Sequence, residues 1–238
     1  MTLERISEYI SPSFASKGPK SHWFGYYNYS PMSADGTKLL AQEVDFDGRD
    51  ILPEDTADIG WYDLKDGSWH KVTITHAINW QQGAMLQWLG PDFNSRIIFN
   101  DVDGEHFCSR IYNIETGEMK TIPFPVYGVS PDGKFSITLQ FERCAWCRAY
   151  HYESIRNPKW NVPVAEEDGI FRVDLETGRS SVSSRFGTLY QGLSQMKATV
   201  PSLIGSSISC LIRQVIGSHF IIGTVMVMNS IRSHIRRM

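Results

Sequence analysis

Residues 79–89 read NWQQGAMLQWL, a strongly apolar and aromatic stretch that nevertheless carries the three glutamines Gln81, Gln82 and Gln87. Adjacent amides in a buried strand need hydrogen-bond partners, which backbone groups, ordered water or a ligand can supply. Turn-forming residues flank the stretch, and a second apolar segment follows at residues 96–102. We therefore interpret residues 79–89 as the inner strand of one blade of a β-propeller, with its polar start near the central channel.

The same order of segments recurs three times between residues 22 and 178. Each unit holds an inner strand, a turn, a second strand, a connection, and a third strand that ends in a glycine turn, often followed by a fourth strand. The glycine turns at residues 63–67, 113–117 and 174–178 are typical of hairpins, because glycine supplies the positive φ that a tight turn needs. Four strands per repeat of about 50 residues favour a propeller, and a β-sandwich with similar turns is the alternative.

Short runs of β-branched and aromatic residues give the expected strands. They are residues 24–31, 38–44, 59–64 and 69–75 in the first unit, 79–89, 96–101, 108–114 and 118–122 in the second, and 126–129, 135–141 and 169–175 in the third. The predicted fold class is thus all-β, a partial β-propeller of about three four-stranded blades. An irregular arm at residues 1–21 precedes the blades at residues 22–178, and an atypical tail follows at residues 179–238.

The average charge and the cysteine content exclude several classes of protein. A formal net charge of -3 and a pI near 6.2 argue against nucleic-acid binding. Four cysteines make no dense disulfide framework, and the first residues, MTLERISEYI, lack the apolar core of a secretory signal. We therefore expect a reduced, cytoplasmic chain.

The composition changes abruptly after Gly178. Residues 179–238 contain no Asp, Glu or Trp, although the chain has 26 acidic residues and seven tryptophans. A membrane segment at residues 203–228 is one interpretation, but polar residues interrupt it and a span needs about 20 apolar residues. We favour the hypothesis that the tail is translated out of frame, since this explains the lost acids, tryptophans and blades together. Such a tail is expected to be disordered or prone to aggregate.

The units resemble the TolB-like propellers, whose blades carry a Ser-x-Asp-Gly turn after the inner strand. This turn stands at residues 33–36 and 130–133. The stretches HWFGYYNYSPMSADG, NWQQGAMLQW, IIFND and EEDGIFRVDLETG are together similar to bacterial proteins related to oligogalacturonate lyases. The resemblance covers about residues 20–178 and implies a ring of six or seven blades, of which three are visible. Three blades leave two broad apolar faces open, so the chain is a fragment, assembles with itself or is covered by its tail.

The resemblance implies β-elimination on an oligogalacturonate, with a metal held by histidines and a glutamine and with a basic residue that abstracts a proton. The histidine-rich motifs of the family belong to later blades, and residues 20–178 hold no match for them. We therefore transfer no catalytic residue and no metal site, and expect no cofactor in this chain, whereas an intact relative would hold a divalent metal. Cys144 and Cys147 form half of a zinc or redox motif without a second pair, so we do not assign a metal to them.

Loops on one face of the propeller are the expected ligand site. Residues 45–58 are acidic, and residues 142–168 form a long loop rich in aromatic residues, arginine and histidine. Aromatic rings stack on sugars, amides bind hydroxyls, and an arginine can bind a carboxylate in two bonds. The predicted ligand-binding residues are His22, Tyr26, Tyr27, Trp80, Gln81, Gln82, Arg143, Arg148 and His151. The alternative is that these aromatic residues only cover the ends of the blades.

Two functions remain open from the sequence. The first is a carbohydrate-active propeller, similar to oligogalacturonate lyases, whose present chain lacks the catalytic half and is inactive alone. The second is a non-catalytic module that binds a ligand or a protein. The expected partners are an oligosaccharide or uronate, or a second copy at the open blade faces. Nucleic acid and membrane are not expected as partners.

Overall fold

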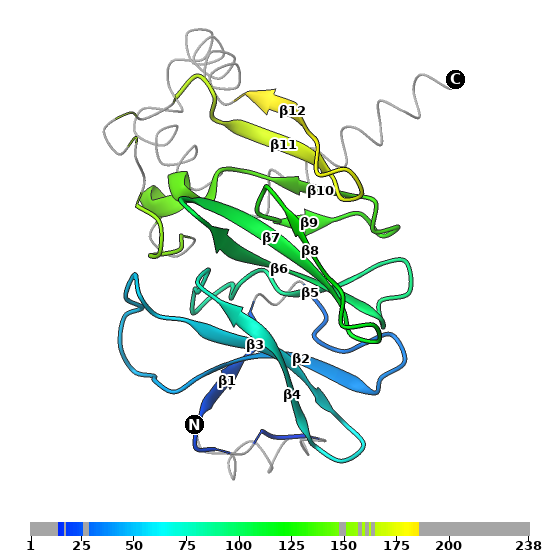
Figure 1. The fold of residues 1–238 in the computed structure, drawn as a ribbon. Helices are drawn as coiled ribbons and strands as arrows, with labels where there is room; N and C mark the ends of the chain where they lie inside the picture. Colours follow the sequence, from blue (N-terminus) through cyan, green and yellow to red (C-terminus); the bar gives the residue numbers. More distant parts are fainter. Residues whose placement is uncertain are drawn as a thin grey trace, which may run out of the picture.

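The computed structural model describes residues 14–16, 18–25, 29–147, 151–156, 159, 162 and 165–185. The described residues form three four-stranded antiparallel sheets, which follow one another like the blades of a fan (Figure 1). Within each sheet the strands are hydrogen-bonded neighbours in chain order. Separate meander sheets placed side by side are propeller blades, and they exclude the β-sandwich alternative, in which two sheets face each other.

The first blade contains β1 (Ser21–Trp23), β2 (Lys38–Val44), β3 (Ala57–Asp63) and β4 (Trp69–Thr75). The second contains β5 (Gln87–Leu89), β6 (Arg96–Asp103), β7 (His106–Asn113) and β8 (Met119–Ile122). The third contains β9 (Gly128–Val129), β10 (Phe135–Thr138), β11 (Gly169–Asp174) and β12 (Ser180–Arg185), with the 3-10 helix η1 (Phe141–Cys147) between β10 and β11. No helix long and apolar enough to span a membrane occurs among the residues described.

The predicted bounds of the inner strands were wrong. The first inner strand is β1, before the expected residues 24–31, and only the last three residues of the 79–89 stretch form β5. The side chain of Asn79 explains the second difference, because its Oδ1 accepts the backbone N–H of both Gln81 and Gln82 at 2.9 Å. The N–H of Gly83 donates to the Asn79 carbonyl at 2.8 Å, so this part of the stretch is a closed turn.

The third blade also differs from the expectation at two places. Its strand β10 ends at Thr138, and Phe141 already begins η1. At the other end, β12 pairs with β11 beyond the predicted boundary at Gly178, so the blade extends to Arg185. Backbone pairing explains how a serine-rich segment completes a sheet, since it needs no particular side chain. Residues 186–238 lie outside the described part. They include the whole of the proposed membrane segment and all of the tail proposed to be out of frame except residues 179–185.

Two apolar clusters join the blades, and β6 contributes to both. Ile97 and Phe99 lie in the cluster with Leu40 and Ile59 of the first blade. The residue between them, Ile98, lies in the other cluster, with Val173 and Leu175 of the third blade. Alternate residues of a strand point to opposite faces, so the middle blade is buried on both sides. The first and third blades each have one face that no described blade covers.

Candidate functional site

Three connections meet at one end of the blades. The indole Nε1 of Trp80, in the β4–β5 connection, donates to the carbonyl of Arg49 in the β2–β3 connection at 3.0 Å. The amide Nδ2 of Asn79 donates at 3.0 Å to the carbonyl of His151, which belongs to the long β10–β11 connection. Connections from all three blades therefore share one face, as expected for a propeller. This loop face is where the candidate site is found.

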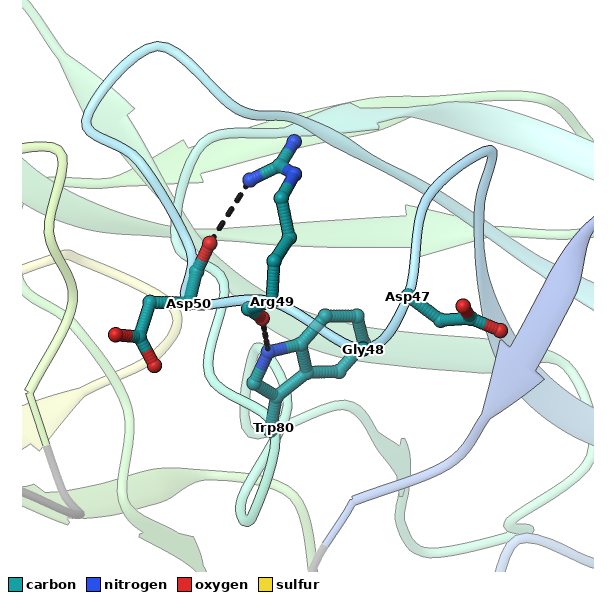
Figure 2. A pocket seen from close by; sticks show the side chains of 5 residues that line it. All are labelled: Asp47, Gly48, Arg49, Asp50 and Trp80. Carbon is teal, nitrogen blue, oxygen red and sulfur yellow. Dashed lines mark hydrogen bonds between the residues drawn. The ribbon is translucent and has the colours of Figure 1, made fainter.

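Trp80 stands at the side of a pocket of about 530 Å³ that Asp47, Gly48, Arg49 and Asp50 complete (Figure 2). The Trp80 residue is 38% exposed, although it is a large aromatic side chain. Its ring packs against Trp23 at 5.1 Å and Phe46 at 5.6 Å between ring centroids. Together with the hydrogen bond to Arg49, these contacts fix the ring in one orientation and leave part of it open to a ligand.

Among the described residues that line this pocket, Arg49 is the one cationic side chain, and it is already paired. The Arg49 guanidinium donates to both carboxylate oxygens of Asp55, at 2.6 and 2.9 Å, and lies 3.9 Å above the Phe46 ring. The Asp55 hydrogen bond raises the pKa of Arg49, and Arg49 in turn lowers the pKa of Asp55. No ion pair to Asp47 or Asp50 is present in the described part of the chain, so their carboxylates set the charge of the pocket.

The glutamines that decided the sequence interpretation have mainly structural surroundings. Buried Gln87 donates to the carbonyls of Met85 at 3.0 Å and Tyr127 at 3.3 Å. Gln82 is buried, whereas Gln81 is exposed at the turn. Backbone groups therefore satisfy the Gln87 amide, without any need for a ligand. The predicted role of Gln81 and Gln82 in binding stays a prediction.

A glutamine outside the predicted set fixes the turn that carries Trp80. Gln42 accepts the N–H of Ala84 at 2.8 Å and donates to the Phe24 carbonyl at 2.5 Å. Gly83 has a φ of 59°, and a Cβ at this position would collide with the Gln42 amide. The Gln42 hydrogen bonds and the close approach at Gly83 fix the turn at residues 79–83 against the first blade. The position of Trp80 therefore depends on the backbone of this turn as well as on the neighbouring side chains.

Arg143 holds the long loop together. Its guanidinium pairs with Asp168, with Nη2 and Oδ2 2.9 Å apart, and donates to the carbonyls of Lys159 and Val162 at 2.5 Å each. The side chains of Arg143 and Asp168 are only 11% and 6% exposed. The sequence predicted that the Arg143 guanidinium binds a substrate carboxylate, but these bonds already engage it. The same loop carries His151, whose Nε2 lies 2.6 Å from a carboxylate oxygen of Glu153.

His22 belongs to a different cavity. Its Nε2 lies 2.7 Å from Glu43 Oε2 and 2.8 Å from the Tyr62 hydroxyl. These groups line a cavity of about 410 Å³ between the arm and the first blade, which we call the arm cavity and which also contains Phe14 and Trp69. Burial, followed by the Glu43 charge, raises the pKa of Tyr62. The structure thus separates His22 from the Trp80 pocket.

Three predicted residues, Tyr26, Tyr27 and Arg148, lie outside the described part. Sequence reasoning missed Asp47, Arg49 and Asp50, although the acidic character of their loop was a usable signal. Among the residues described, no group of three or more His, Cys, Asp or Glu side chains could hold a metal ion. Cys108 and Cys144 are both buried, the Cys108 thiol is free, and burial raises the pKa of Cys108 to about 11.

Comparisons with known proteins concern the fold. No protein-family model matches the sequence, and no curated protein does so. Among solved structures, TolB from Acinetobacter baumannii is 14% identical, with a TM-score of 0.41 over 68% of this chain and 32% of that one. An oligogalacturonate lyase in complex with manganese is 19% identical, with a TM-score of 0.43 over 68% and 40% of the two chains.

An oligogalacturonate lyase from Vibrio parahaemolyticus is 17% identical, with a TM-score of 0.44 over 72% of this chain and 41% of that chain. The matched part therefore spans less than half of the length of each of these three proteins, between 32% and 41%. The chain is similar in fold to part of the TolB and oligogalacturonate lyase propellers.

Proposed function

We propose that this chain is a carbohydrate-binding part of a β-propeller and that the Trp80 pocket is its site. The partly exposed Trp80 ring is the observation that carries the proposal, because it lines a pocket, and ligand pockets are typically lined by aromatic side chains with a few polar groups. Its packing against Trp23 and Phe46 presents a rigid apolar surface of the kind that stacks on the C–H face of a sugar. Rigid aromatic rings lose little conformational entropy on binding.

The polar groups around the ring suit hydroxyl groups. Asp47 and Asp50 offer carboxylate oxygens, which accept hydrogen bonds from hydroxyls. A ring that stacks on one face of a sugar, with acceptors at its edge, provides both affinity and orientation. We assign binding and no catalytic step to the described residues, because Arg143, one of the two arginines expected to bind a substrate carboxylate, is paired with Asp168, and the other, Arg148, lies outside the described part.

We propose that the chain is related by descent to lyase-like propellers, and we assign no lyase activity to the described residues. The similar lyases act on oligogalacturonate, and we place any catalytic half of such a protein, with its divalent metal, outside the described residues. We also propose a cytoplasmic setting, which the free thiol of Cys108 supports.

Ligand titration tests this proposal directly. Oligosaccharides of neutral, cationic and anionic type are added while the tryptophan fluorescence and the melting temperature are followed. A ligand at a hundred times its Kd should stabilise the native state by about 2.7 kcal/mol, provided that it binds only that state. Trp80→Ala should abolish the response, whereas Leu52→Ala, at an exposed apolar residue of the β2–β3 connection that does not line the pocket, should leave it unchanged. No response to any sugar would reject the proposal.

The second candidate is a protein-interaction module, and one observation favours it. In the arm cavity, His22 Nδ1 and Trp69 Nε1 are buried without a hydrogen-bond partner in the part of the chain that is described. They lie on the blade face that no described blade covers, which is where a second copy would pack. Sedimentation velocity distinguishes the two candidates. A stable dimer without any sugar response would favour the module, and a monomer that binds sugar would reject it.

A further inference from the structure

The charge around Trp80 restricts the kind of sugar that the pocket can take. The β2–β3 connection contains Asp45, Asp47, Asp50, Glu54 and Asp55, and its only basic residue is Arg49. The inference rests on the proposed function and deepens it. We infer that the Trp80 pocket binds sugars that carry an ammonium group, in preference to uronates.

The positions of the charged groups support this preference. Figure 2 shows the Asp47 and Asp50 carboxylates on opposite sides of the Trp80 indole, while the Arg49 guanidinium extends away from the ring. That guanidinium is bound by Asp55 through both of its oxygens, so one positive and one negative charge cancel. Asp47 accepts only a neutral donor among the described contacts, the Ser21 hydroxyl at 2.9 Å. Arg49 Nη1 also donates to the Asp50 carbonyl at 2.8 Å, but no ion pair to the Asp47 or Asp50 carboxylate is present among the described residues. Two carboxylates thus line the pocket, one on each side of the ring (Figure 2).

Lys20 and Lys71 are paired with other carboxylates. Lys20 pairs with Glu43 at 2.6 Å and lies 3.5 Å from Asp58, and Lys71 pairs with Asp58 at 2.7 Å. None of these groups lines the Trp80 pocket. A uronate carboxylate placed on the ring would therefore meet two like charges. An ammonium group would meet two opposite charges, and the π face of Trp80 would attract it as well.

Simple electrostatics gives the size of the expected effect. Two charges about 5 Å apart in water change a binding constant about fourfold, with the sign depending on whether they attract or repel. Loss of one carboxylate should therefore weaken binding of an amino sugar about fourfold and strengthen binding of a uronate by a similar factor. These charges are open to solvent, so the effect should shrink as salt rises from low to molar concentration.

The experiment uses three probes that share one ring configuration and one linkage. They are α-1,4-linked tetramers of galactosamine, of methyl-esterified galacturonate and of free galacturonate, which are cationic, neutral and anionic. Each is titrated by calorimetry against the full chain, against Asp47→Asn and Asp50→Asn, and against Glu118→Gln. The last variant removes one negative charge from an exposed turn between β7 and β8 and serves as the matched control.

The expected order of affinity is cationic, neutral, anionic. Each pocket variant should reduce the affinity ratio between neighbouring probes about fourfold, and hence the cationic-to-anionic ratio about sixteenfold, while the control leaves both ratios unchanged. Equal affinities, or the tightest binding by free galacturonate, would overturn the inference while the proposed function stands. Binding of none of the three probes, or of any other sugar, would reject both together. A spread that the control changes as much as the pocket variants would also overturn it, since the net charge of the chain would then explain the order.

Discussion

The two ends of the blades follow different rules. At the end that carries the hairpin turns, all three blades repeat one arrangement: the N–H of Gly67, Gly117 and Gly178 donates to the carbonyl four residues earlier, at 2.8, 2.9 and 2.9 Å. Each of these glycines has a φ between 70° and 75°. At the loop face the three connections between second and third strands share neither length nor role.

The connection in the first blade forms the Trp80 pocket, that in the second is a tight turn at Gly104, and that in the third is a packed body held by Arg143. The end with the repeated glycine turns therefore depends on backbone hydrogen bonds, which many sequences can make. The loop face depends on particular side chains, so it can change in function without changing the fold.

Loss of the Arg143 guanidinium should have the largest effect on stability. Arg143→Ala leaves the buried Asp168 carboxylate without its partner, which typically costs about 3 kcal/mol or more. Urea denaturation followed by circular dichroism measures it. Arg172→Ala is the control, because the interactions described for this exposed arginine are its position over the Phe135 ring and its charge near Asp174, worth about 1 kcal/mol or less. Equal, small effects of both changes would show that the long loop is not part of the cooperative structure.

Replacement of Asn113 tests whether the repeated end depends on its turns. The Oδ1 of Asn113 accepts the N–H of Glu115 at 2.9 Å and of Thr116 at 3.1 Å, so Asn113→Ala should cost about 1 kcal/mol of unfolding free energy. Asp63→Ala and Asp174→Ala should behave alike, because both carboxylates accept N–H groups of their own turns. Glu115→Ala, in the same turn, should change stability by less than about 0.5 kcal/mol. A cost confined to one of the three turns would contradict their equivalence.

The smallest predicted effect is a difference in the pH dependence of stability between a variant at the turn end and a variant at the loop face. At the turn end, the Ser33 hydroxyl and then the Thr37 N–H and hydroxyl lower the pKa of Asp35, and the Ser130 hydroxyl and the Lys134 N–H lower that of Asp132. A carboxyl whose pKa is lower in the folded state stabilises the fold above its unfolded pKa of about 3.9. This contribution is lost as the pH falls from there through the folded pKa.

Melting temperatures between pH 6 and pH 3 measure the effect. Asp35→Asn should be less stable than the wild type at pH 6 and should lose less stability on acidification, whereas Asp50→Asn at the loop face should parallel the wild type. Parallel curves for Asp35→Asn and the wild type would show that the turn carboxylate adds no pH-dependent stability.

The repeated strands could be predicted from the sequence because they depend on local patterns. Residues 38–44 and 69–75 are strands with the predicted bounds, and the glycine turns stand where the pattern put them. The inner strands could not be predicted, because an apolar run such as residues 79–89 has no periodicity that separates a strand from a buried turn. Only the partner of Asn79 Oδ1, which is the backbone of its own turn, decides between the two.

The sequence predicted some parts of the candidate site but not how they come together. Trp80 was selected as an aromatic residue at the start of a blade, and the acidic loop at residues 45–58 was recognised as long enough to have a role. Their meeting was not visible, because the hydrogen bond from Trp80 to Arg49 joins residues 31 positions apart. Arg143 was selected for its charge, but its partner Asp168 follows 25 residues later and turns it into a structural group.

The sequence by itself determined an all-β chain of repeated blades, since hairpin turns and strand alternation are encoded within a few residues. The tertiary structure alone decided which polar groups remain open to a ligand. A guanidinium or an amide is available only if no other part of the chain reaches it first, and that depends on distances in the folded state. For this reason Arg143 and Gln87 are bound within the fold, while no ion pair within the described part of the chain engages the carboxylates beside Trp80.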